Sequence, residues 1–198
     1  MTTVDRGLEL QLVTRLRAGD AAAFDAVYGA YNRRLFTFLA RLSSRRDVAE
    51  DLVEETCLRL VAHGDRLQPD TRLGPWLFTV ARNLYLSYRR SRMLEDTYRP
   101  DATGSWPGAG VFRSPFEETA ATEFERQLEA ALAELPLAYR EVLLLVGVEG
   151  LRPAEAAIVC GVSPEAMRQR LSRARALLAE KLEDARRLPA AIPREATP

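Results

Sequence analysis

Apolar residues recur three and four positions apart along most of the chain, which is the spacing of an amphipathic helix. One such stripe covers residues 24–42 and follows Asp20, whose side chain suits an N-cap. A second stripe begins shortly afterwards, and we expect Gly64 to end it because glycine adopts the left-handed cap conformation without steric cost. After a polar loop over 65–75, the pattern predicts one long helix over 76–93. No alternating run between turns indicates a strand, so the sequence predicts an all-α fold.

Proline and glycine residues break the helical pattern between positions 97 and 122. We therefore predict two small helical domains joined by a flexible linker. The predicted boundaries are a first domain at 1–96, the linker at 97–122, a second domain at 123–188 and a tail at 189–198. The linker carries apolar side chains, among them Trp106 and Phe112. We expect them either to fit a groove on a partner or to pack back onto the domains.

The second domain contains a helix-turn-helix motif. The motif is predicted from a short helix over 154–160, a turn at 161–163 and a second helix after the turn. In the second helix, Ser163 is the N-cap and Pro164 takes the first position. The second helix of such a motif enters the major groove of DNA. Arginine and glutamine suit base edges and phosphates, and this helix carries Arg168, Gln169, Arg170, Ser172, Arg173 and Arg175. An ordinary helical hairpin with an arginine-rich outer face is the alternative.

The predicted helix over 76–93 interleaves aromatic and basic side chains. Aromatic rings can stack on unpaired bases while arginines follow the phosphates of a single strand. The residues in question are Trp76, Arg82, Asn83, Tyr85, Arg89 and Arg90. For Trp76, packing in the core is the preferred interpretation.

Charge is sorted along the chain although its sum is zero. The 28 basic residues, of which Lys181 is the single lysine, balance 28 acidic residues. Residues 47–55 contain five acids and no base, 72–92 contain five arginines and no acid, and 166–178 contain four arginines and no acid. Such sorting allows a protein partner and a polyanion to bind on separate surfaces.

The acidic block forms rows at helical spacing. Asp47, Asp51 and Glu55 are four residues apart in one row, and Glu50 and Glu54 form another. These rows indicate either a docking patch for a basic protein or a divalent-metal site, which would need matching carboxylates on another helix.

The numbers of cysteine and histidine residues, together with the hydropathy, exclude several classes of site and of protein. One histidine excludes a multi-histidine metal site, and two cysteines, Cys57 and Cys160, cannot form a disulfide framework. We expect Cys160 to be a small buried apolar residue, and a redox switch formed with Cys57 is the alternative. No stretch approaches the roughly 18 apolar residues of a membrane span, and no signal-peptide pattern opens the chain. A cytoplasmic protein without membrane insertion is expected.

In this order, these features resemble the extracytoplasmic-function (group IV) sigma factors of bacterial RNA polymerase. Residues 12–20 (LVTRLRAGD), 47–58 (DVAEDLVEETCL) and 76–83 (WLFTVARN) are similar to parts of region 2 in that family. Residues 132–136 (LAELP), 139–145 (YREVLLL) and 166–178 are similar to region 4.

The resemblance implies a promoter-specificity subunit, with no catalytic residues, no metal and no cofactor. It implies that core polymerase contacts Asp47, Glu50, Asp51, Glu54 and Glu55. It also implies that the −10 element contacts Trp76, Arg82, Asn83, Tyr85, Arg89 and Arg90, and the −35 element contacts the six residues named above for the helix-turn-helix. Core polymerase, promoter DNA and an anti-sigma factor are the implied partners.

Three other interpretations stay open. The chain could be a stand-alone helix-turn-helix regulator that binds DNA without polymerase. It could be a sigma mimic that sequesters an anti-sigma factor. It could also be a helical, metal-dependent nucleotide hydrolase that uses Glu50, Asp51 and Glu54.

Overall fold

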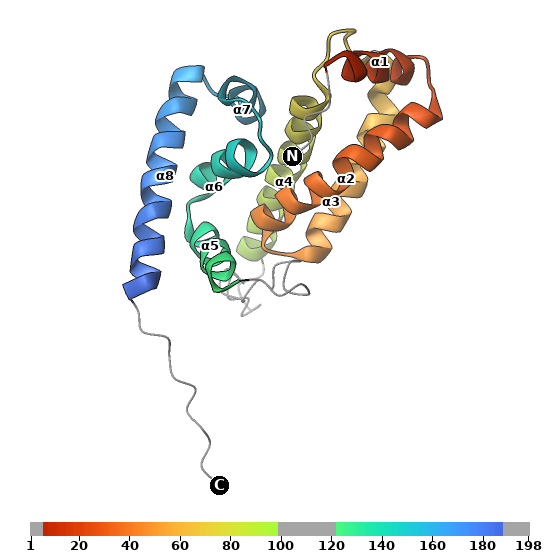
Figure 1. The fold of residues 1–198 in the computed structure, drawn as a ribbon. Coiled ribbons are helices and arrows are strands. Elements are labelled where there is room, and N and C mark those ends of the chain that lie inside the picture. Colours follow the sequence, from red (N-terminus) through yellow and green to blue (C-terminus); the bar gives the residue numbers. More distant parts are fainter. Residues whose placement is uncertain (1–5, 99–121, 188–198) are drawn as a thin grey trace.

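Every element that the computed structural model describes, over residues 6–98 and 122–187, is a helix (Figure 1). The helices form two groups that lie side by side, with α8 at the outer edge of the second group. The first group comprises α1 (Arg6–Arg17), α2 (Ala21–Ser43), α3 (Arg46–His63), the short η1 (Gly64–Arg66) and α4 (Leu73–Tyr98). The second comprises α5 (Glu123–Glu134), α6 (Leu137–Leu143), η2 (Leu144–Val148), α7 (Pro153–Cys160) and α8 (Pro164–Arg187).

The predicted all-α class with two helical domains is confirmed. The predicted linker lies outside the described residues apart from positions 97, 98 and 122, and so do its side chains Trp106 and Phe112. The predicted tail at 189–198 lies outside them entirely.

The core of the first group forms where α2 and α4 cross. The rings of Phe38 and Phe78 are both fully buried and meet edge to face, with centroids 5.2 Å apart. Leu35 and Leu39 from α2 and Leu77 from α4 are buried in the same hydrophobic core. Asp20 caps α2 as predicted, because its side chain accepts the N–H of Ala22.

The first turn of α4 differs from the prediction, which placed residues 65–75 in a loop. The helix begins at Leu73 because the N–H of Leu73 donates to the buried carboxylate of Glu9 at 2.7 Å. A carboxylate at this position satisfies an N–H group that the helix cannot pair itself. Pro75 is tolerated because it lies in the first turn. The cap therefore comes from Glu9 on α1, 64 residues earlier in the chain.

Gly64 does not end α3 in the way that the sequence suggests. Its backbone is right-handed (φ −57°, ψ −37°), and the chain continues into η1. Gly64 is buried, and an added Cβ would lie 3.6 Å from the carbonyl oxygen of Leu16. A Cβ at this position would make an ordinary van der Waals contact, so the packing against α1 does not itself require glycine. The left-handed cap occurs instead at Ser44 (φ 54°), after α2.

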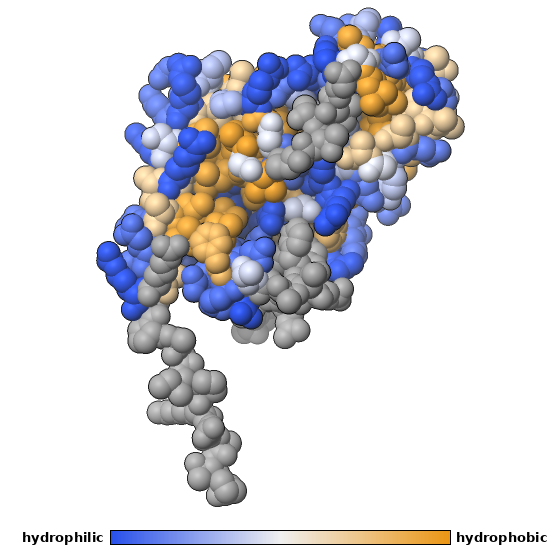
Figure 2. All heavy atoms as spheres, viewed as in Figure 1, coloured by the Kyte–Doolittle hydropathy of each residue, from blue (hydrophilic) through white to orange (hydrophobic). Residues whose placement is uncertain are grey.

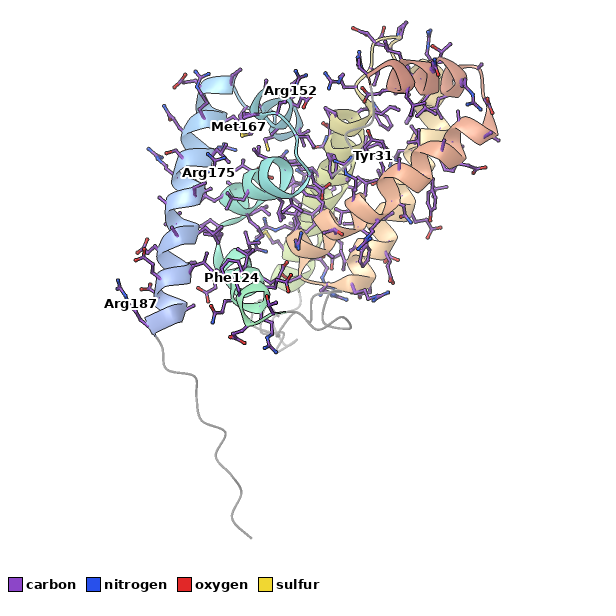
Figure 3. The ribbon with its side chains drawn as sticks, viewed as in Figure 1. Tyr31, Phe124, Arg152, Met167, Arg175 and Arg187 are labelled. Atoms are coloured by element: carbon purple, nitrogen blue, oxygen red, sulfur yellow. The ribbon has the colours of Figure 1, made fainter. Side chains whose placement is uncertain are left out.

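The helix-turn-helix has the predicted local structure. Gly161 adopts a left-handed conformation (φ 64°) after α7, and the hydroxyl of Ser163 accepts the N–H of Ala166 at 3.1 Å. Met167 is fully buried and points from α8 toward α6 and α7 (Figure 3). The opposite side of α8 is consequently turned to solvent.

Replacing Phe78 with alanine should lower the free energy of unfolding by about 3–5 kcal/mol, because a fully buried ring leaves a cavity. Urea denaturation followed by circular dichroism measures this loss. Leu58→Ala is the matched control, because that side chain is 55% exposed, and it should change stability by less than about 0.5 kcal/mol. Equal losses in the two variants would contradict this assignment of the core.

Candidate nucleic-acid and protein interfaces

The outer face of α8 carries most of the residues predicted to contact the −35 element. Five of the six are exposed: Arg168, Gln169, Ser172, Arg173 and Arg175. Leu171 and Ala174 are buried on the opposite side of the helix. Figure 2 shows hydrophilic side chains along this edge of the molecule. The structure thus brings these five residues together on one helix surface.

Arg170 differs from the other five. Its side chain is half-buried and turns inward, and its Nη1 lies 4.0 Å from the carboxylate of Glu141 on α6. In this conformation Arg170 contacts an acid of its own helical group and is only partly exposed to solvent.

Arg82, predicted to contact the −10 element, is held by the same carboxylate. Its Nε and Nη2 donate to the two oxygens of Glu141 at 2.8 and 3.1 Å. The two side chains are only 15% and 3% exposed. Burial works against the charged guanidinium, but the hydrogen bonds and the charge of Glu141 prevail and raise the pKa of Arg82.

The other predicted −10 residues divide into two classes. Tyr85 is buried, and its hydroxyl donates to the carbonyl of Leu42 at 2.7 Å. Trp76 packs against the core, which was the preferred interpretation of this residue. Arg89 is half-buried. Asn83 and Arg90 are the two of the six with exposed side chains. The described conformation therefore leaves most of this predicted surface covered.

The acidic block lies on α3, and four of its five predicted polymerase contacts are exposed. The exception, Glu55, is half-buried. Three of the carboxylates pair with arginines of the same segment: Asp47 with Arg45, Glu50 with Arg46 and Glu55 with Arg59. Asp51 and Glu54 have no ion pair within the described part of the chain.

An apolar groove of about 610 Å³ lies between α2 and α3. Its most exposed apolar residues are Tyr28, Leu58 and Val61, which are 45%, 55% and 63% exposed. Tyr28 and Val61 belong to the apolar stretches of α2 and α3, yet both side chains are turned outward. Glu50 and Glu54 border the groove, so the acidic block and this apolar surface are continuous.

Neither cysteine is in a disulfide. Cys160 is buried beside Glu141 and Arg82, and burial raises the pKa of its thiol to about 12. Cys57 lines the groove between α2 and α3, and burial raises its pKa as well. Both thiols are therefore weak nucleophiles at neutral pH, which gives the redox alternative no support.

Within residues 6–98 and 122–187, no group of three or more histidine, cysteine or acidic side chains is arranged to hold a metal ion. No helix in these ranges is both long and apolar enough to cross a membrane.

Family comparisons match both helical groups. Residues 27–94 match the model "Sigma-70 region 2", and residues 125–178 match the model "Sigma-70, region 4". The first match contains α3 and most of α4, and the second contains the helix-turn-helix.

Curated relatives extend this match to most of the chain. The ECF RNA polymerase sigma factor EcfG of Rhodopseudomonas palustris is 42% identical over 148 residues, which cover 75% of this chain and 78% of the relative. The ECF RNA polymerase sigma factor SigM of Bacillus subtilis is 32% identical over 152 residues, which cover 76% and 90%.

Solved structures show the same fold. The sigma factor RpoE of Bartonella quintana, solved in complex with the anti-sigma factor NepR, has a TM-score of 0.63 and 29% identity, and the match covers 88% of this chain and 93% of that one. CnrH, solved with the cytosolic domain of CnrY, has a TM-score of 0.65 and 23% identity, with 89% and 97% covered. The two region models, the curated relatives and the shared fold together establish that the chain belongs to the extracytoplasmic-function group of the sigma-70 family.

Proposed function

We propose that this sigma factor binds core RNA polymerase through α3, contacts the −10 element through α4 and contacts the −35 element through α8, and so directs promoter-specific initiation. One observation carries the proposal: the exposed acids of residues 47–55, a stretch without a base, and the exposed arginines of residues 166–178, a stretch without an acid, lie on different helices. The acidic helix α3 and the basic helix α8 lie on opposite sides of the molecule (Figure 1). One side can then face a protein while the other faces DNA.

For the −35 element, the proposal uses the outer face of α8. B-form DNA has a major groove wide enough for a helix, and arginine can bind guanine through two hydrogen bonds. Gln169 and Arg173 are four residues apart and exposed, so both reach the same stretch of groove. Arg168 and Arg175 are placed to contact base edges or the flanking phosphates.

For the −10 element, the proposal uses α4 and separated strands. Asn83 and Arg90 are exposed in the described conformation, and Arg82 must leave Glu141 before it can reach DNA. Extruding a base costs a few kcal/mol, which contacts in a protein pocket can offset. Such opening uses binding energy alone, and it requires neither nucleotide hydrolysis nor a cofactor.

For the polymerase, the proposal uses the acidic block together with the groove between α2 and α3. A partner helix with basic and apolar side chains would match both parts, since apolar burial supplies affinity and charge supplies orientation. Asp51 and Glu54, the two carboxylates of the block without an ion pair in the described residues, are the ones we expect to be decisive.

An anti-sigma factor is the second protein partner in this proposal. The Bartonella relative was solved with one, and an inhibitor that covers the polymerase-binding face would prevent initiation. The location proposed for the chain is the cytoplasm, where bacterial polymerase acts.

The alternatives differ from this proposal in how they depend on polymerase. A stand-alone helix-turn-helix regulator would bind its site as a dimer without polymerase. A sigma mimic would bind an anti-sigma factor and would not support transcription. Dependence of promoter binding on polymerase therefore separates the three.

Asp51→Lys should weaken binding to core polymerase while leaving the fold unchanged, because it places a positive charge in the acidic block. Equilibrium binding of purified chain to core enzyme measures this effect, and circular dichroism checks the fold. Asp184→Lys is the control, because it makes the same charge change at an exposed site on α8. Equal affinity of the Asp51 variant and the unchanged chain would refute the docking assignment.

Arg173→Ala should weaken promoter binding by the polymerase holoenzyme by about 1–3 kcal/mol, which is the usual loss for a base contact. Footprinting on an intact promoter and on one with a replaced −35 element measures it. The loss should vanish on the replaced element. Arg187→Ala, also on α8 but at its far end (Figure 3), should bind like the unchanged chain. The −35 assignment fails if the Arg173 variant loses affinity equally on both promoters.

A further inference from the structure

Arg170 lies on the inner side of α8, although its neighbours along the chain face outward. It follows Met167 by three residues and precedes Ala174 by four, and both of these side chains are fully buried (Figure 3 shows Met167). Residues three and four apart share one face of a helix. Arg170 therefore belongs to the side of α8 that packs on α6 and α7, and its guanidinium faces Glu141 on α6.

Three helices meet at the carboxylate of Glu141. Arg82 from α4 contacts it at 2.8 Å, and Arg170 from α8 lies 4.0 Å away. The thiol of Cys160 from α7 is hydrogen-bonded to it as well. The Glu141 side chain is only 3% exposed. A buried carboxylate needs charged or hydrogen-bonding partners, so this one restrains the helices that provide them.

Two of the three partners belong to the helix-turn-helix. Cys160 is the last residue of α7, and Arg170 lies in the second turn of α8, so Glu141 contacts the motif on both sides of its turn. Arg82 must leave Glu141 before it can reach DNA, and the two contacts with the motif then remain. The carboxylate keeps a cationic partner, which avoids the large cost of an unpaired buried charge.

We propose that Arg170 and Glu141 are positioning residues for −35 recognition: the pair fixes α8 against α6 in the orientation that brings Gln169 and Arg173 to the base edges, and Arg170 itself contacts no base. This inference deepens the proposed function and rests on it, because it needs α8 to enter the major groove. It removes Arg170 from the predicted −35 contacts and gives a buried acid a part in reading the promoter.

The conformation of Arg170 favours positioning over a base contact. To reach a base, its guanidinium would have to leave Glu141 and turn from the inner to the outer side of α8. Gln169 and Arg173 reach that outer side without any such change, because both are exposed. Side chains that recognise a ligand have to be held within about 0.5 Å and 10–20° of the productive geometry by the residues beneath them. A charge pair under the recognition helix supplies such a restraint.

A base contact and a positioning role predict opposite effects of removing the charge of Glu141. If Arg170 bound a base, Glu141 would compete with DNA for the guanidinium, and Glu141→Gln would strengthen −35 binding. If the pair positions α8, Glu141→Gln releases Arg170 and weakens −35 binding. The sign of the change therefore distinguishes the two roles.

The test compares binding of the polymerase holoenzyme to an intact promoter and to one with a replaced −35 element. The ratio of the two affinities isolates −35 recognition, because a change at Arg82 alters both affinities alike. We expect this ratio to fall about tenfold in Glu141→Gln and in Arg170→Met, a coupling of ordinary size for residues in contact. The double variant should also fall about tenfold, and not about a hundredfold, because either change alone breaks the pair.

The matched controls are Glu183→Gln and Arg187→Met. These two residues form an exposed ion pair on the same helix, 3.6 Å apart, and neither change should alter the ratio. Circular dichroism checks that each variant is folded. Arg170→Lys, the mildest change, keeps a positive charge opposite Glu141 and should lower the ratio less than about threefold, whereas lysine cannot replace the two-donor fork of arginine at a base.

A ratio that rises in Glu141→Gln would overturn the inference and make Arg170 a DNA contact. An unchanged ratio in folded Glu141→Gln or Arg170→Met would overturn it too, as would losses that multiply in the double variant or a tenfold loss in Arg170→Lys. The proposed function is judged separately, by the unchanged chain. If its holoenzyme does not distinguish the two promoters, the −35 assignment itself fails. If it does and the variants behave identically, only the positioning role is refuted.

Discussion

The carboxylate of Glu141 lies between two arginines, Arg82 from α4 and Arg170 from α8. A buried carboxylate is costly unless it is paired and hydrogen-bonded, and Glu141 is 2% exposed. The Arg82–Glu141 pair links α4 to α6 and, together with the packing of α4 on α7, orients the two helical groups relative to each other. The exposed and covered parts of the proposed DNA surface follow from that orientation.

Charge sorting then explains how one neutral chain can present two kinds of surface. Some acids pair with arginines inside the molecule, as in Arg82–Glu141 and Arg41–Glu129. Others, such as Asp51 and Glu54, are exposed without an ion pair in the described residues. Arginines on α8 stay exposed because buried apolar residues occupy the other side of that helix. The 28 acids and 28 bases are thus divided between internal ion pairs and separate acidic and basic outer faces.

Local signals in the sequence predicted the parts of the fold that depend on local energetics. Gly161, Ser163 and Pro164 define the turn and the start of α8 through their own conformational preferences, and the structure agrees. The start of α4 could not be found in this way, because its cap is Glu9, 64 residues earlier. Gly64 shows the same limit, since the chain continues through it into η1 in a right-handed conformation and does not end α3 with a left-handed cap.

The sequence predicted which residues belong to the candidate site, but it did not predict which of their side chains are exposed. Helical spacing shows that Arg82 and Tyr85 share a helix with Asn83, and it cannot show which of them a second group of helices covers. Tyr28 and Val61 are apolar and periodic, yet they line an open groove. Periodicity predicts which residues share a face of a helix, whereas the partner of that face depends on the whole fold.

We propose that acids on α3 bind core polymerase while arginines on α4 and α8 bind the promoter. Run-off transcription with purified chain, core bacterial polymerase and a mapped promoter is the decisive experiment. We expect a transcript from one defined start site, absent with core enzyme alone. A chain that neither binds core polymerase nor confers a start site on it would refute this division of the surface.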